Sequence, residues 1–409
     1  MKNLGLTYCT NVHPIVDLTS WRDIIGSFGP SIRSGLGWKS LPMGLWFPAS
    51  LVEEMNQDPQ NTLLRFQKVL SDNQLFAFTC NAFPFGNFHE SVVKTKVYHP
   101  NWTTSARLEY TLACAKILAA LIPKGETGSV STLPLGWRIG WSESDSRVSV
   151  MNLISFVKMA RELLLKENRT IRLGLEPEPG CALETTLQVI EFWNTMLRPE
   201  AKLAGITDEE LNTHLGLCYD TCHQAVQFEN PTDMLDKIHA ADIPIVKMQL
   251  SSALEFKADP DGLSKLERMQ FVEPRFLHQT RIKTPGGIIG FDDLPDALAA
   301  ASQVQSELWN YPWRVHYHLP IDSSDMLDSK AVATTREDML KAYAYAVVKD
   351  RCRHFEVETY TWSVLPEAHR PKTDADLAQS IARELRYVYG KLPPDSIVNG
   401  SPFKGDGHG

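Results

Sequence analysis

The chain has 409 residues, of which 43% are hydrophobic and 22% are charged, and this composition is typical of a globular protein. The net charge of −8 and the lack of a basic stripe argue against nucleic acid as a partner. No apolar run reaches the length of a membrane span, so none is expected. Seven scattered cysteines, and an N-terminus without an apolar leader segment, predict a reduced, cytoplasmic protein.

Short apolar segments alternate with longer helical patterns along the chain, which is typical of parallel βαβ units. Apolar residues at three- and four-residue spacing predict helices over 51–70, 106–121, 150–167 and 336–350. Nine segments read as strands: 4–9, 43–47, 75–80, 129–134, 171–176, 215–220, 245–250, 314–319 and 355–360. A barrel of this type has eight strands, so one segment lies outside it, and the candidates are 43–47, 314–319 and 355–360.

This pattern predicts an α/β fold, a (β/α)8 TIM barrel that forms a single domain over residues 1–391. Residues 253–312 follow a predicted strand and contain Pro and Gly residues that interrupt regular secondary structure, so we expect an inserted lid there, after strand seven. The aromatic- and histidine-rich segment 81–104 also follows a strand and is expected on the catalytic face. Residues 392–409 are rich in Pro and Gly and are predicted to be a flexible tail.

Polar side chains stand where four predicted strands end: Glu176, Asp220, Gln249 and Glu358. An α/β barrel builds a metal site in this way, with one ligand from the C-terminal end of each of several strands. Carboxylates favour hard divalent cations, and imidazoles shift the preference towards manganese, cobalt or zinc. Taken singly, each residue has an ordinary alternative as a helix cap, an ion-pair partner or a satisfied buried amide.

Three further residues accompany these strand ends. Glu178 is expected on the same side of the chain as Glu176, where it would contact the substrate. His223 follows Asp220 by three residues and would touch the metal or the substrate. Lys247 shares a strand face with Gln249, and it is either an electrophile facing the substrate or a member of a structural ion pair.

Two histidines share one face of segment 314–319. His318 is nearer the strand end and is predicted to bind the metal, and His316 is predicted to bind the substrate. His278 lies in the expected lid, where it contacts the substrate or the solvent. Asn11 and Trp362 follow strands and are predicted to line the pocket.

The order of these residues resembles that of the xylose isomerase-like TIM barrels, the superfamily of sugar isomerases and epimerases. The resemblance implies metal binding by Glu176 at strand five, by Asp220 with His223 at strand six, by a histidine at strand seven and by a glutamate at strand eight. Gln249 stands where the histidine of strand seven is expected. His318 and Glu358 compete for the last position.

Within that superfamily, the amino-acid sequences of seven segments resemble those of the EboE-type proteins. The segments are LTYCTNVHP, STLPLGW, LEPEPGC, CYDTCHQAV, KMQLSSAL, FLHQT and VETYTW, and the resemblance spans residues 1–370. EboE-type proteins are TIM barrels of a gene cluster tied to making or exporting a secondary metabolite. The resemblance implies a role in secondary-metabolite biosynthesis or metabolite traffic.

We therefore predict a metal-dependent isomerase or epimerase that acts on a small polyhydroxylated carbonyl compound, a sugar or a cyclitol, with Mn, Mg, Co or Zn as cofactor. Glu176 or Glu358 would move the proton next to the carbonyl, and His223 and Lys247 would hold substrate oxygens. Gln249 suggests a non-catalytic metabolite-binding or trafficking protein instead. Further potential metal ligands suggest, as another alternative, a metal-dependent hydrolase with several clustered ions. The sequence is compatible with a homo-oligomer.

Overall fold

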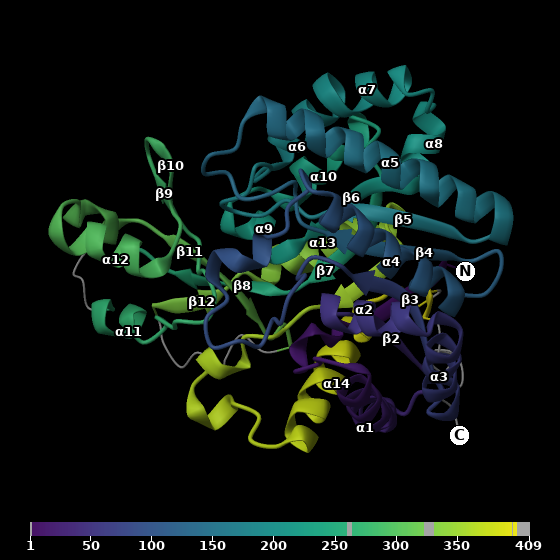
Figure 1. Cartoon of the computed structure of the whole chain (residues 1–409). Coiled ribbons are helices and arrows are strands. Elements are labelled where there is room, and N and C mark those ends of the chain that lie inside the picture. Colours follow the sequence, from purple (N-terminus) through teal and green to yellow (C-terminus); the bar gives the residue numbers. More distant parts are fainter. Residues whose placement is uncertain (1, 260–263, 323–330, 395, 399–409) are drawn as a thin grey trace.

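The computed structural model describes residues 2–259, 264–322, 331–394 and 396–398, and its centre is a (β/α)8 barrel (Figure 1). Eight parallel strands form the barrel wall: β1 (Lys2–Tyr8), β2 (Leu41–Trp46), β3 (Leu75–Asn81), β4 (Thr127–Thr132), β5 (Thr170–Leu175), β6 (Leu215–Asp220), β7 (Ile245–Leu250) and β13 (His354–Val357). A parallel bridge between Cys9 and Gly44 joins the first two strands and closes the ring. The predicted fold class is confirmed.

Helices follow the strands and pack on the outside of the barrel. They are α1 (Leu18–Leu36), α2 (Ala49–Gln57), α3 (Pro59–Asp72), α4 (Ser105–Leu121), α5 (Glu143–Glu167), α6 (Thr186–Phe192), α7 (Arg198–Leu203), α8 (Asp208–His214), α9 (Thr221–Val226), α10 (Pro231–Ala240), α13 (Arg336–Val348) and α14 (Asp374–Gly390). The predicted helix over 51–70 is two helices, because Pro59 begins α3 after Asp58 leaves the helical conformation. No helix in the described part of the chain is long and apolar enough to cross a membrane.

Most residues of the barrel strands are buried because helices cover the outside of the barrel and side chains fill its interior. Every residue of β2, β6 and β7 is buried. Among the buried polar residues, Asp220 lies at the C-terminal end of its strand, and Lys247 and Glu356 form a pair within the barrel. The apolar core therefore fixes the scaffold, and the buried polar residues are left to form a site.

Segment 314–319 is the predicted strand that lies outside the barrel. It belongs to β11 (Trp313–Leu319), which pairs antiparallel with β8 (Ser252–Phe256) and β9 (Thr280–Thr284). Segments 43–47 and 355–360 contain the barrel strands β2 and β13. Glu358 therefore follows the eighth barrel strand, and His318 does not.

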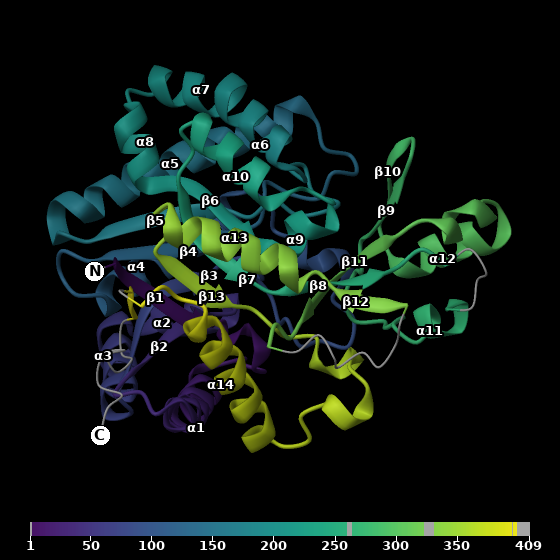
Figure 2. The ribbon, with the colours of Figure 1, turned by 180° about the vertical axis from the view of Figure 1, so that it is seen from behind.

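The long connection after β7 forms a small unit of its own, with β10 (Gly287–Phe291), β12 (Val332–Thr334), α11 (Lys265–Met269) and α12 (Leu294–Gln303). Its five strands run in the order β10-β9-β11-β8-β12 and cover a separate apolar cluster. Figures 1 and 2 show this unit, in green, projecting from one side of the barrel. We call residues 252–334 the insertion; it extends beyond the segment 253–312 expected as a lid.

The C-terminal segment returns to the barrel. Ser396–Val398 forms β14, which pairs parallel with β1 as a ninth strand of the same sheet. The rest of the predicted flexible tail, residues 399–409, lies outside the described residues.

Candidate active site

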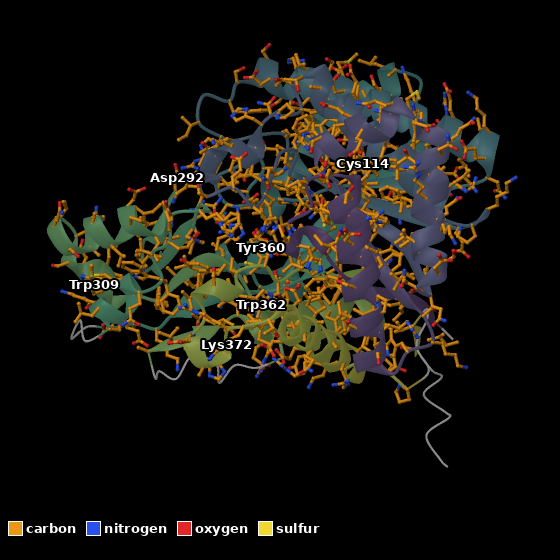
Figure 3. The ribbon with its side chains drawn as sticks, turned by 60° about the horizontal axis from the view of Figure 1, so that its bottom comes forward. Cys114, Asp292, Trp309, Tyr360, Trp362 and Lys372 are labelled. Atoms are coloured by element: carbon orange, nitrogen blue, oxygen red, sulfur yellow. The ribbon has the colours of Figure 1, made fainter. Side chains whose placement is uncertain are left out.

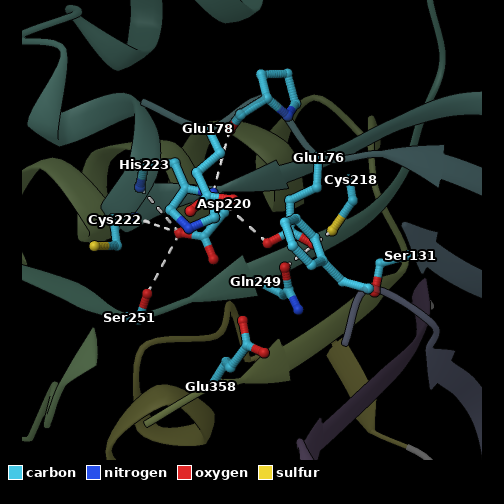
Figure 4. A network of polar contacts seen from close by, with 12 residues as sticks. Ser131, Glu176, Glu178, Cys218, Asp220, Cys222, His223, Gln249, Ser251 and Glu358 are labelled. Atoms are coloured by element: carbon cyan, nitrogen blue, oxygen red, sulfur yellow. Dashed lines mark hydrogen bonds and ion pairs between the residues drawn. The ribbon is translucent and has the colours of Figure 1, made fainter. Parts of the chain in front are cut away.

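Three carboxylates meet at the C-terminal end of the barrel. Glu176 directly follows β5, Asp220 ends β6, and Glu358 follows β13. One oxygen of each lies within 4.8 Å of one oxygen of each of the others, and all three residues are at most 4% exposed. Figure 4 shows the three side chains around Gln249. Three buried carboxylates at this spacing are a plausible set of ligands for one divalent cation.

Each of these carboxylates has an oxygen that accepts two hydrogen bonds, an oxygen without a hydrogen-bond partner, or one of each. Asp220 accepts hydrogen bonds through Oδ1 from the backbone nitrogens of Cys222 (2.7 Å) and His223 (3.1 Å). Glu358 accepts through Oε1 from the amides of Asn11 (2.7 Å) and another asparagine, Asn81 (2.9 Å). Among the described residues, Oδ2 of Asp220 and Oε2 of Glu176 have no hydrogen-bond partner. Buried oxygens of this kind need a partner, and a cation supplies one.

The electrostatics of the group favour a cation as well. Burial raises the pKa of Glu176 well above its ordinary value, and the nearby Glu358 and Asp220 raise it further. Burial likewise raises the pKa of Glu358, with a further contribution from Asp220. The cluster therefore resists carrying three negative charges by itself, and a divalent cation between the carboxylates would remove that penalty.

Three imidazoles gather beside the carboxylates. His223 lies in the first turn of α9, and His316 and His318 lie on β11 of the insertion, so the barrel and the insertion build this cluster together. All three side chains are buried, and their Nε2 atoms lie within 3.4 Å of one another. Burial lowers the pKa of His223 to about 3 and that of His318 to about 4, so both rings are neutral at pH 7.

Glu178 lies on the other side of the imidazoles. Its Oε1 accepts hydrogen bonds from the Tyr98 hydroxyl (2.7 Å) and the Gln279 amide (3.2 Å). Burial raises the pKa of Glu178 to about 8, although both hydrogen bonds act in the opposite direction. Glu178 lines the pocket described next.

A pocket with an accessible volume of about 50 Å³ leads to these groups. It is lined by Glu176, Glu178, His223, His316, His318, Glu358 and Asn11, and by an apolar wall of Phe83, Pro84, Phe88, Val97, Phe276, Leu277 and Tyr360. Figure 3 shows Tyr360 between the insertion and the barrel. Its ring stacks on His318 with 4.5 Å between the ring centroids. The lining of the pocket therefore presents both polar and apolar faces.

Five of the predicted site residues do not line this pocket: Asp220 and Gln249 lie beside Glu176 and Glu358 but outside the lining, and the other three lie further away. Lys247 is fully buried inside the barrel, where its Nζ lies 2.6 Å from Oε2 of Glu356. His278 binds Glu273 (2.5 Å) through Nε2 and stacks on Tyr317. Trp362 packs in the apolar cluster of the insertion. The lining of the pocket therefore gives no support to substrate contacts by these residues.

The surroundings of Gln249 support its predicted role as a metal ligand only in part. It lies on β7 between the carboxylates, but its Oε1 accepts a hydrogen bond from the thiol of Cys218 (3.2 Å). Its Nε2 is buried and has no partner among the described residues. In this orientation the amide offers the pocket a donor, and rotation of the amide by 180° would offer the oxygen instead.

Four residues of the site are absent from the set predicted from sequence: Asn81, Tyr98, Gln279 and Tyr360. Asn81 ends β3, and the rule that selected Glu176 and Asp220, a polar residue at a strand end, also applies to it. Tyr360 stands two residues after Glu358. Tyr98 and Gln279 lie in long connections, where no periodic pattern indicates which side chain faces the pocket.

Solved structures resemble this chain in architecture. The IOLI protein with a bound zinc atom shares 12% identity over 95% of this chain and 99% of that one, with a TM-score of 0.46. A xylose isomerase domain protein from Salmonella typhimurium LT2 shares 11% over 94% and 97% (TM-score 0.40). The probable 3-DHS dehydratase AsbF from Bacillus anthracis shares 12% over 74% and 90% (TM-score 0.38). No family model and no curated protein matches the sequence.

Proposed function

We propose that this protein is a metal-dependent isomerase or epimerase acting on a small polyhydroxylated carbonyl compound, a sugar or a cyclitol. The single observation that carries the proposal is the meeting of Glu176, Asp220 and Glu358 at the C-terminal end of the barrel, with oxygens within 4.8 Å of one another. Active sites of this fold lie at that end. The three residues come from three different strands, so only the folded barrel brings them together.

The three carboxylates would hold a divalent cation. The ligands are all oxygens, and manganese and magnesium prefer such ligands. Bound there, the cation would polarise a substrate carbonyl and an adjacent hydroxyl. The unpartnered oxygens of Glu176 and Asp220 support this placement.

A carboxylate of the same group would move the proton at the carbon next to the carbonyl. Asn11 and Asn81 fix the orientation of Glu358 by donating to one of its oxygens, which leaves the other free to accept a proton. Glu176 approaches from β5, and its Oε2 is free as well. One of the two would take the proton and return it.

The pocket wall would bind and shield the substrate. Phe83, Phe88 and Tyr360 would cover the apolar face of a sugar ring and exclude water from it. Glu178 and His223 line the pocket and would hold substrate hydroxyls. Lys247 would act only indirectly, as a buried positive charge inside the barrel.

The cellular setting is a further part of the proposal. The EboE-like segments support a role in secondary-metabolite biosynthesis or traffic. All seven cysteines are buried free thiols, which supports a cytoplasmic location, where thiols stay reduced.

Solvent deuterium exchange tests the reaction. The full chain with manganese is incubated in D₂O with a panel of ketoses and keto-cyclitols, and deuterium next to the carbonyl is measured. We expect exchange in at least one compound, its loss on chelation or in Glu176→Gln, and no change in His369→Gln, a variant at an exposed site. Binding of a panel member without any exchange would overturn the proposed reaction and favour the metabolite-binding alternative.

A second candidate function is a metal-dependent hydrolase. The observation that favours it is the imidazole cluster of His223, His316 and His318 beside the carboxylates, because two adjacent ions are typical of phosphoester hydrolysis. Release of nitrophenol from bis(p-nitrophenyl) phosphate by the metal-loaded chain, lost in Glu176→Gln, would support it. No release would count against it.

A further inference from the structure

Helix α4 on the outside of the barrel has very few charged residues. It spans 17 residues, and its charged residues are Arg107, Glu109 and Lys116. Arg107 is fully buried and donates to the backbone carbonyls of Pro100 and Ala82, so two charges remain for the outer side of the helix. A helix on the surface of a globular protein normally has a broad polar face, and a helix that is apolar on all sides is normally covered on all sides. The composition of α4 is therefore that of a helix with a partner on its outer side.

The outward residues of α4 form one stripe along the helix. They are Glu109, Leu112, Ala113, Lys116 and Ala120, and their three- and four-residue spacing places them on one face. The two charged residues are exposed, and the three apolar ones are half-buried. A groove with an accessible volume of about 420 Å³ follows this stripe, and residues of α2 and α3 line its other side. The stripe is therefore an open surface of the molecule.

The exposed apolar surface is not confined to α4. Helix α4 packs between α5 on one side and α2 and α3 on the other (Figure 1). Leu64 of α3 is 62% exposed, and Met151 of α5 is 54% exposed. A stable dimer buries about 800 Å² of each partner, which is more than one pair of helices provides, so contacts of the flanking helices are needed as well. Exposed apolar residues on both flanking helices meet this need.

The stripe is complementary to a second copy of itself. Two copies of α4 can lie antiparallel about a two-fold axis that passes between Leu112 and Ala113. Glu109 then lies opposite Lys116 of the partner subunit, and Leu112 lies opposite Ala113 of the partner subunit. A two-fold interface requires this property, because the same patch forms both sides of it. The small alanine side chain gives the leucine room between the two helices.

The two charges of the stripe have no partner within their own chain. In the described part of the chain, neither Glu109 nor Lys116 forms an ion pair. The two residues are two helical turns apart, about 10 Å along the axis, which is too far for them to pair with each other. An antiparallel second copy brings an opposite charge to each of them.

We propose that this stripe of α4, together with the groove beside it, is the contact through which two copies of the chain form a symmetric dimer. The partner is a second copy because acid meets base and large meets small under a single two-fold axis. The stripe lies on the outer wall of the barrel, whereas the pocket lies at the C-terminal end of the strands. The dimer therefore does not depend on the reaction proposed for the pocket.

Charge reversal at the two exposed positions tests the proposal. Sedimentation equilibrium of the full chain at micromolar concentrations measures the dissociation constant of the dimer, and circular dichroism checks the fold of each variant. We expect the unchanged chain to dimerise, and Lys341→Glu, an exposed control on α13, to dimerise equally well. Glu109→Lys and Lys116→Glu each place like charges opposite each other at two symmetric contacts. Each should weaken the dimer by about tenfold or more.

A mixture of the two single variants gives the sharpest readout. In a pair of one Glu109→Lys chain and one Lys116→Glu chain, both contacts again join a base and an acid. We therefore expect the mixture to dimerise like the unchanged chain, although each variant alone does so weakly. The double variant Glu109→Lys/Lys116→Glu should recover the dimer as well.

Three results would overturn the proposal. They are an unchanged chain that stays monomeric, a dimer that both single variants leave intact, and a mixture that dimerises no better than its components. A monomeric chain that holds a different protein on α4 would also overturn it, because the stripe would then serve another partner.

Discussion

Lys247 and Glu356 form an ion pair in the interior of the barrel, with 2.6 Å between Nζ and Oε2 and with both side chains fully buried. Burial alone would lower the pKa of Lys247, but the Glu356 carboxylate raises it above its ordinary value, so the lysine stays charged. Gly44 makes room for the pair, because a Cβ at that position would lie 1.8 Å from Oε1 of Glu356. The positive charge of Lys247 also lowers the pKa of Glu176 and Glu358, against the larger effect of burial.

Breaking this pair from one side should destabilise the protein strongly. Lys247→Met leaves the Glu356 carboxylate buried and unpaired, and we expect it to lower the free energy of unfolding by about 3–5 kcal/mol. Lys247→Met/Glu356→Leu removes both charges and should recover most of that loss. Urea unfolding measures both variants. A loss below about 1 kcal/mol in the single variant would show that the pair has little structural weight.

Neutralising one carboxylate of the metal site should have opposite effects with and without metal. Without metal, Glu176→Gln relieves repulsion among buried carboxylates and should raise the free energy of unfolding by about 1–3 kcal/mol. With manganese, the unchanged chain should gain stability and the variant should gain little, because a ligand is missing. Thermal unfolding with and without manganese tests this, and equal gains in both proteins would contradict it.

Replacing Gln249 by histidine should strengthen the carboxylate site. The amide oxygen now accepts from Cys218, so it contributes little to the site, whereas an imidazole offers a nitrogen ligand. We expect Gln249→His to tighten cobalt or zinc binding by about tenfold, which corresponds to about 1.4 kcal/mol. Isothermal titration calorimetry measures the change, with Gln249→Leu as the matched control. Equal affinities in the histidine and leucine variants would place the cation elsewhere.

The buried Glu384 on α14 should make stability depend on pH. Burial, and then Asp322, raise the pKa of Glu384 to about 8. Between its unfolded pKa and pH 8 the folded carboxyl group keeps a proton that the unfolded chain loses. Stability therefore falls as pH rises through this range, by up to about 1.4 kcal/mol per pH unit for this group.

The test window lies between pH 6.5 and 8. Below about pH 6.5 the buried histidines act in the opposite direction, because their folded pKa is lowered and the unfolded chain binds the extra protons. Glu384→Gln keeps the oxygen that accepts from Thr359 and Ile321 and removes the titration. We expect it to flatten the fall of stability across the window. Parallel curves for the variant and the unchanged chain would contradict the assignment.

Ion pairs hold the insertion against the barrel. Arg281 of β9 binds Glu184 (2.8 Å) in the loop after β5, and Lys94 binds Asp293 of the insertion (2.5 Å). Glu184→Gln weakens the first pair, and we expect amide hydrogens of β9 and β10 to exchange about tenfold faster, with unchanged exchange in the barrel. Glu143→Gln removes an exposed pair with Arg147 and should change nothing near the insertion. Equal exchange in the two variants would show that these pairs do not hold the insertion.

The barrel was predictable from sequence because its signal is local. Buried strands and helices with apolar residues at three- and four-residue spacing alternate along the chain, and polar residues stand at several strand ends, as Glu176 and Asp220 do. Which strands pair is not a local property. Segment 314–319 has the same apolar character as a barrel strand, and only its antiparallel pairing with β8 and β9 separates it.

The same reason explains the gaps in the predicted site. Lys247 lies on a predicted strand, but its partner Glu356 lies more than a hundred residues later, so the sequence alone does not distinguish an ion pair from a substrate contact. The imidazole cluster joins His223 of the barrel to His316 and His318 of the insertion, and only the packing of the insertion against the barrel creates it.

A crystal of the full chain soaked in manganese shows whether the three carboxylates bind a cation. Data collected at the manganese absorption edge locate the ion by its anomalous signal. We expect a peak between Glu176, Asp220 and Glu358, at about 2.0–2.3 Å from one oxygen of each. A fully occupied manganese site away from these carboxylates, or no peak among them at millimolar manganese, would contradict it.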